Sequence, residues 1–138
     1  MNISKFTQKS IQAVQELEKC AYDFGHQEIE EEHLLHILLN QDESLISKMI
    51  EKMEIDTQYF KNSVEQLLSK RPKVSGGKPY VGQYLNKALV EAEGEAKAMG
   101  DEYVSVEHLF LSILSNPSSE MKTLFKEFGI TRERFLKH

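Results

Sequence analysis

Residues 25–34 read Gly-His-Gln-Glu-Ile-Glu-Glu-Glu-His-Leu, and residues 100–109 read Gly-Asp-Glu-Tyr-Val-Ser-Val-Glu-His-Leu, so the second stretch repeats the first 75 positions later. The register holds without a gap through the rest of both halves, where further identical pairs are Leu39 and Leu114, Ile55 and Ile130, and Phe60 and Phe135. Self-similarity at a fixed period marks a repeated structural unit. The chain is therefore predicted to contain two copies of one module.

Each copy has the apolar spacing of helices throughout, and no alternating strand of convincing length occurs. We predict four helices in each copy, which gives one all-α domain of eight helices in two pseudo-symmetric sets. Repeat 1 covers residues 1–70, a connector covers residues 71–82, and repeat 2 covers residues 83–138. The connector contains two prolines and the pair Gly76-Gly77, a composition typical of a solvated loop.

The ends of the first helices have clear signals. Thr7 is the expected N-cap, and Gly25 and Gly100 are expected to end these helices, because glycine adopts the left-handed C-cap conformation without a steric penalty. The expected inward-facing residues are Val14, Leu17, Ala21 and Phe24 in repeat 1, and Leu85, Ala88, Leu89, Ala92, Ala96 and Met99 in repeat 2.

The later helices follow the same logic. Ile29 or Val104 is expected to lead, as a short extended segment, into a second helix that ends near Leu39 or Leu114, and Ser105 is the expected N-cap of the second copy. The third helices are predicted over Ser44–Met53 and Ser119–Phe128. The fourth helices are predicted to start after Ile55-Asp56 and Ile130-Thr131.

Charge and hydropathy exclude several classes of partner. The net charge is −5, and the basic residues are scattered apart from Lys70-Arg71-Pro72-Lys73, whereas nucleic-acid binding needs clustered Lys and Arg. The longest apolar runs are far shorter than the roughly 20 residues of a spanning helix, and the polar start has no signal-peptide pattern. We expect a cytoplasmic protein that contacts neither nucleic acid nor membrane.

Catalytic and metal-binding motifs are weak. Glu30 and His33 have the one-turn spacing used in di-iron bundles, but the second copy has Ser105 and His108 at these positions, so a symmetric metal site would lose a carboxylate. No phosphate loop, zinc-protease motif or serine nucleophile elbow occurs. Cys20 stands alone and aligns with Glu95, which favours a tolerant helix position. We expect no catalytic residue, no metal and no cofactor in this chain, and therefore a binding module.

The sequence also resembles a known family. Phe6-Thr7 at the head of the first helix, the repeated Glu-His-Leu and the whole run of residues 100–109 resemble the duplicated amino-terminal domain of Clp ATPases, over essentially the entire chain. The connector run of residues 71–77 is similar to that of the ClpB disaggregase branch. The resemblance implies a pseudo-dimeric helical domain that a flexible linker joins to two ATPase modules of a ring hexamer. Those modules would bind ATP and are absent from this chain.

The resemblance further implies that the domain captures unfolded or aggregated client proteins for threading by the ATPase ring. Its groove would lie near the first helix of each copy and the start of the second helix of repeat 2. The residues that the resemblance assigns to substrate binding are Thr7, Leu89, Asp101, Glu107, His108 and Leu109.

Each of these positions also has a plain structural explanation. Thr7 is suited to capping, Leu89 to the core, Asp101 to a turn, and Glu107 to the first turn of a helix. Thr7 aligns with Gly82, and Asp101 aligns with His26, and this asymmetry favours a functional role. The alternative function is docking of adaptors for a ClpC- or ClpA-type unfoldase that feeds a protease.

Overall fold

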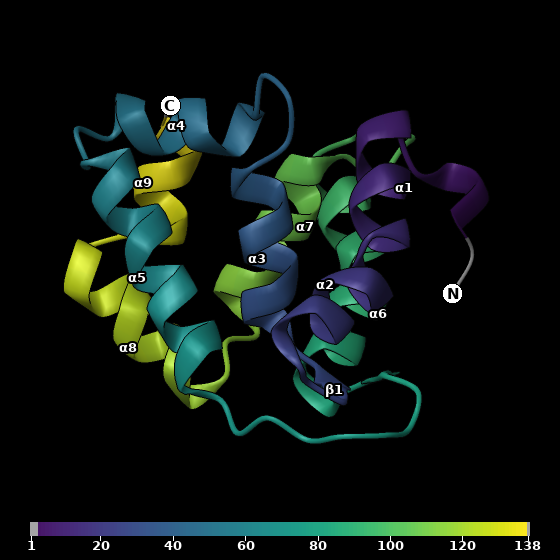
Figure 1. The fold of residues 1–138 in the computed structure, drawn as a ribbon. Helices are drawn as coiled ribbons and strands as arrows, with labels where there is room; N and C mark the ends of the chain where they lie inside the picture. The colour runs from purple at the N-terminus through teal and green to yellow at the C-terminus, as the bar shows by residue number, and fades with distance from the viewer. Residues whose placement is uncertain (1–2, 138) are drawn as a thin grey trace.

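The computed structural model describes residues 3–137, which are mostly helical (Figure 1). Repeat 1 contains α1 (Gln8–Gln15), α2 (Leu17–Phe24), α3 (Glu31–Leu39), α4 (Leu45–Lys52) and α5 (Thr57–Lys70). Repeat 2 contains α6 (Gln83–Ala98), α7 (Val106–Ser115), α8 (Ser119–Phe128) and α9 (Arg132–Lys137). A 3-10 turn, Ile3–Lys5, precedes α1, and two short strands are β1 (Glu28–Ile29) and β2 (Tyr80–Val81). The predicted all-α architecture of two similar sets of helices is confirmed.

The first helix of repeat 1 is interrupted, which the sequence did not predict. α1 ends at Gln15 and α2 begins at Leu17, whereas the counterpart α6 is continuous. The Cys20 N–H still donates to the Glu16 carbonyl at 2.9 Å across the break. α1 and α2 therefore form one bent helix, and the count of eight helical units holds.

The second helices form the centre of the molecule. Figure 1 shows α3 and α7 in the middle, with α1, α2 and α6 on one side and α4, α5, α8 and α9 on the other. α3 is buried on almost every side, since eight of its nine residues are buried. It is too apolar to be a surface helix, and its polar residues must find partners inside the protein.

Most of the predicted inward-facing residues of the first helices are buried, with three exceptions. Met99 is 44% exposed, because α6 ends at Ala98 and the chain turns there. The other two are half-buried at the edge of the core and are Val14 and Phe24. No helix within residues 3–137 is both long and apolar enough to cross a bilayer.

The segment before the first helix of each repeat pairs with the backbone of the other repeat. At the amino-terminal junction, which we define as the pairing of Phe6 with Val104, the Val104 N–H donates to the Lys5 carbonyl at 2.7 Å and the Thr7 N–H donates to the Val104 carbonyl at 2.9 Å. At the connector junction, which is the parallel pairing of β1 with β2, the Gly82 N–H donates to the Ile29 carbonyl at 2.8 Å. Each repeat thus supplies the residue that precedes its first helix to the other repeat.

The helix starts at the two junctions are capped differently. The Thr7 hydroxyl accepts from the Ser10 N–H at 3.3 Å, as the sequence predicts for an N-cap. Gly82, at the equivalent place, has no side chain, and the Glu30 carboxylate of repeat 1 accepts from the Leu85 N–H at 2.8 Å instead. The asymmetry between Thr7 and Gly82 therefore has a structural cause, because a glycine makes room for a carboxylate from the other repeat.

Adding a methyl group at Gly82 should test this capping arrangement. A Cβ atom there would lie 2.6 Å from the Glu30 carboxylate, although the backbone φ of −75° suits any residue. We expect Gly82→Ala to lower the free energy of unfolding by about 1–3 kcal/mol, because the displaced carboxylate leaves the buried Leu85 N–H without an acceptor. Gly94→Ala is the matched control in the same helix. It meets no atom within 4 Å and should stabilise the domain by up to about 1 kcal/mol in a urea titration. Equal effects at both glycines would contradict this account.

Candidate functional site

The histidine of each Glu-His-Leu motif closes the start of the second helix. The Glu30 N–H donates to Nδ1 of His33 at 2.9 Å, and the Ser105 N–H donates to Nδ1 of His108 at 2.9 Å. Both rings belong to capping boxes in which they occupy the third helical position. Because a backbone N–H can only donate, each ring carries its proton on Nε2.

The two Nε2–H groups find different partners at one equivalent position. Nε2 of His33 lies 2.8 Å from Nδ1 of His26, and Nε2 of His108 lies 2.8 Å from Oδ2 of Asp101. The position that is His26 in repeat 1 and Asp101 in repeat 2 thus supplies the acceptor for the histidine Nε2–H in both repeats, as a ring nitrogen in one and as a carboxylate in the other. His26 is buried, whereas the Asp101 side chain is 49% exposed, so only repeat 2 presents this acceptor to solvent.

The buried histidine pair is held uncharged. Burial lowers the pKa of His33 to about 3, and the neighbouring His26 and the positive charge of Arg71 act in the same direction. Burial, followed by the charge of Arg71, also lowers the pKa of His26. This pair is therefore a neutral structural element at physiological pH.

Three consecutive carboxylates at the start of α3 each bind a remote element. Glu30 caps α6 as described above, and Glu31 accepts from the Ser118 N–H at the start of α8 at 2.9 Å. Glu32 accepts from Nη1 of Arg71 at 3.0 Å. Burial raises the pKa of Glu31 to about 8 and also raises the pKa of Glu30. These acids hold the two repeats and the connector together. Glu30 and His33, the pair with the spacing of a metal site, are both engaged in structural hydrogen bonds.

The connector follows the body of the protein over part of its length. Nη2 of Arg71 also pairs with Glu28 at 3.1 Å, and the Val74 N–H donates to the Gly25 carbonyl at 3.0 Å. The last residues of the connector form β2. The segment thus combines docked ends with an exposed middle.

The predicted site residues divide into a buried group and an accessible group. Leu89, His108 and Leu109 are 5%, 2% and 1% exposed, so they pack in the core and offer no contact surface. Their assignment to a groove is corrected accordingly, and His108 acts by holding Asp101. The accessible group contains Thr7, Asp101 and Glu107.

The accessible residues border the amino-terminal junction. The Ser105 hydroxyl donates to Oε1 of Glu107 at 3.1 Å. Val104, which precedes Ser105, accepts through its carbonyl from the Thr7 N–H. Exposed apolar side chains lie in the same two segments, namely Ile3 (38%), Met99 (44%) and Tyr103 (51%). The sequence predicts Met99 to face inward and does not single out Ile3 or Tyr103, since an apolar residue near a helix end carries no signal of exposure. The junction thus offers apolar surface beside two oriented carboxylates.

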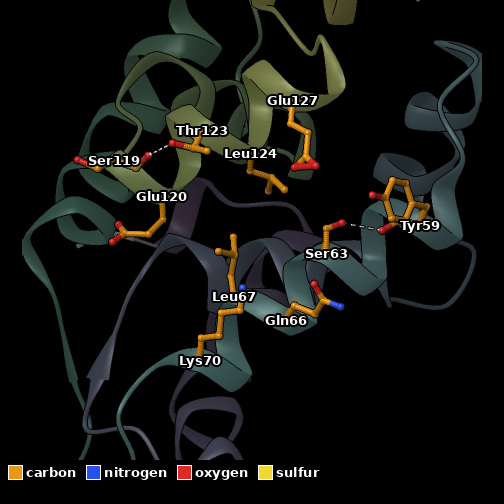
Figure 2. A pocket seen from close by; sticks show the side chains of 10 residues that line it. All are labelled: Tyr59, Ser63, Gln66, Leu67, Lys70, Ser119, Glu120, Thr123, Leu124 and Glu127. Atoms are coloured by element: carbon orange, nitrogen blue, oxygen red, sulfur yellow. Dashed lines mark hydrogen bonds between the residues drawn. The ribbon is translucent and has the colours of Figure 1, made fainter.

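A separate cleft of about 490 Å³ lies between α5 and α8 (Figure 2). Leu67 and Leu124 point toward each other across it, and Glu120, Glu127 and Lys70 surround them. The hydroxyls of Ser63 and Thr123 are occupied, because each donates to a carbonyl of its own helix. The cleft is an open seam between the two repeats that carries one lysine and two glutamates.

Neither the single thiol nor any cluster of possible metal ligands offers a reactive site among the described residues. Burial raises the pKa of the Cys20 thiol to about 11, which keeps it in the unreactive protonated form. Within residues 3–137, no group of three or more His, Cys, Asp or Glu side chains is arranged to hold a metal ion.

Comparison with known proteins identifies the fold. The family described as the Clp repeat (R) N-terminal domain matches residues 5–128. The chain belongs to this family. The Chaperone protein ClpB of Nitratidesulfovibrio vulgaris is 41% identical over 99% of this chain, and the match covers 16% of the ClpB length. The chain thus spans about one sixth of the length of that curated relative.

Solved structures of Clp N-terminal domains share the architecture. The Hsp104 N-terminal domain from Candida albicans superposes with a TM-score of 0.84 at 18% identity, over 97% of this chain and 88% of that one. A ClpV N-domain in complex with a VipB peptide superposes with a TM-score of 0.78 at 22% identity, over 99% of this chain and 85% of that one. At these identities the likeness establishes the fold.

Proposed function

We propose that this Clp N-terminal domain binds unfolded segments of client proteins for a ClpB-type disaggregase, at the amino-terminal junction. The observation that carries the proposal is the half-exposed carboxylate of Asp101, which a buried histidine orients beside exposed apolar side chains. ATP would be bound by ATPase modules of the parent hexamer. The peptide complex of the ClpV N-domain supports the view that this fold can present a peptide-binding surface.

The chemistry of the junction defines the kind of segment that it would bind. Ile3, Met99 and Tyr103 can cover an apolar side chain without reading a particular sequence. The carboxylates of Asp101 and Glu107 can accept main-chain N–H groups of an extended chain and attract Lys or Arg side chains. The preferred ligand is therefore an unfolded segment that combines apolar and basic residues.

Client binding should weaken when these carboxylates lose their charge. We expect Asp101→Asn and Glu107→Gln each to raise the dissociation constant for an unfolded protein by about three- to tenfold, which corresponds to one charge-assisted hydrogen bond. The side-chain amide oxygen of the Asp101→Asn variant can still accept from His108, so stability should stay close to that of the wild type. Reduced, carbamidomethylated lysozyme, an unfolded chain that is rich in basic residues, is a suitable probe, and amide shifts report its binding.

The controls are Asp42→Asn and Glu51→Gln, which neutralise exposed carboxylates elsewhere on the surface. Both should bind the probe as the wild type does. If the two control variants weaken binding as much as the junction variants, only net charge matters and the site is wrong. Binding of native lysozyme in preference to the unfolded form would contradict the proposed function.

A further inference from the structure

The connector junction contains a free main-chain edge. In the parallel pairing of β1 with β2, the N–H groups of Tyr80 and Gly82 donate to Gln27 and Ile29, so the N–H and carbonyl of Val81 point away from β1. Within residues 3–137, no hydrogen bond joins either Val81 group to another residue. Val81 is 43% exposed, and the edge is therefore open to solvent.

The equivalent edge at the amino-terminal junction is closed by the chain itself. Phe6 aligns with Val81, and the Phe6 N–H donates to the Ile3 carbonyl at 3.0 Å within the 3-10 turn. In repeat 2 the residue aligned with Ser4 is Pro79, and the chain before it runs through Gly76 and Gly77 and makes no such turn. The two junctions therefore differ: a carbonyl of the chain's own turn accepts from the Phe6 N–H, whereas no described residue accepts from the Val81 N–H.

The surroundings of the free edge are apolar. Tyr80 and Tyr84 are 54% and 40% exposed and flank Val81 along the chain. An isolated exposed aromatic residue is ordinary, but two exposed tyrosines near an exposed, unpaired strand residue resemble the edges to which extended peptides add. Charged side chains, which usually protect such an edge, are absent from positions 79–82.

We propose that β2 is a second client-binding surface, at which an extended segment adds to the free edge by pairing its main chain with Val81. The carbonyl of the segment accepts from the Val81 N–H, its N–H donates to the Val81 carbonyl, and an apolar side chain covers Tyr80 or Tyr84. The inference rests on the proposed function for the nature of the ligand, an unfolded segment, but it uses none of the residues of the amino-terminal junction. The amino-terminal junction supports a backbone ligand at this place, because the Ile3 carbonyl accepts from the N–H of Phe6, the residue equivalent to Val81.

Hydrogen exchange of the Val81 amide provides the direct test in the wild-type domain. The Val81 N–H has no partner among the described residues, so it should exchange rapidly, and saturating carbamidomethylated lysozyme should slow its exchange by about tenfold or more. The amides of Tyr80 and Tyr84 should shift in the same titration. An unchanged exchange rate at Val81 under saturation would overturn the proposal.

A substitution that removes the Val81 donor gives the second test. Val81→Pro deletes an N–H that no described residue uses, and we expect it to weaken binding of the same probe by about two- to tenfold, the equivalent of one hydrogen bond. Val81→Thr keeps the N–H and the branched shape and should bind within about twofold of the wild type. Thermal unfolding checks that both variants fold, and the exchange measurement decides the matter if Val81→Pro does not fold.

The two surfaces can fail separately. If Val81→Pro binds like the wild type while Asp101→Asn weakens binding, the proposed function stands and the second surface is refuted. If only Val81→Pro weakens binding, clients bind at β2 and the amino-terminal junction is refuted. If neither variant changes binding, both surfaces are wrong.

Discussion

A His33→Ala variant should lose about 3–5 kcal/mol of unfolding free energy, because it combines a cavity with two unpaired polar groups. The His33 ring is fully buried and bridges the Glu30 N–H and Nδ1 of His26. Both groups belong to buried residues, so removal of the ring leaves them without a protein partner. Urea unfolding, followed by circular dichroism at pH 7, measures the loss.

The equivalent change in repeat 2 is the control. His108→Ala also removes a capping acceptor, but its second partner, Asp101, is half-exposed and can bind water instead. We expect a smaller loss, about 1–3 kcal/mol. If His108→Ala cost as much as His33→Ala, burial of the partner would not explain the difference between the two copies.

A Glu31→Gln variant should change how stability depends on pH. Burial raises the pKa of Glu31 to about 8 in the folded protein, whereas an exposed glutamate in the unfolded chain titrates near 4.5. The folded state therefore holds a proton that the unfolded state releases, and the contribution of Glu31 to stability is lost as the pH rises from about 4.5 through 8. Glutamine keeps the acceptor for Ser118 without this cost. The variant should match the wild type near pH 5 and exceed its stability at pH 8.

The buried histidines make stability depend on pH in the opposite direction at low pH. Because the pKa values of His33 and His26 are lowered, their contribution is complete above about 6.5 and is lost as the pH falls. Glu31→Gln should leave this acid limb intact. Glu51→Gln, at an exposed site, should follow the wild-type curve at every pH. A Glu31→Gln curve that runs parallel to that of the wild type between pH 5 and 8 would show that Glu31 is ionised throughout.

The internal repeat made the fold predictable, because identical residues in one register had to occupy equivalent places. Gly25 ends α2 in the left-handed conformation, as predicted, and the third helices begin beside the predicted serines. The break at Glu16 has no counterpart in the helix pattern of the sequence. The pairing of β1 with β2 was also not predicted, since two-residue strands are too short to show alternation.

The candidate site was less predictable, because its polar residues act through partners far along the chain. In the sequence, the asymmetries at Thr7 and Asp101 favour a functional role, and the structure gives each a local cause in capping and in histidine binding. Whether Leu89 is buried depends on how α6 packs. The helical spacing alone is compatible with a core position and with a position in a groove. The free edge at Val81 is a property of pairing geometry and leaves no mark in the composition.

The cross-repeat contacts of α3 have a consequence for synthesis of the chain. Glu30 and Glu31 find their partners 55 and 87 positions later, so the central helix of repeat 1 leaves the ribosome before the groups that complete it. At about 5–20 residues per second, the nascent chain waits roughly 4–17 s for Ser118. During that interval repeat 1 exposes the apolar surface of a half-built protein. A Clp N-terminal domain would then, for a few seconds of each synthesis, resemble the kind of client that we propose it binds.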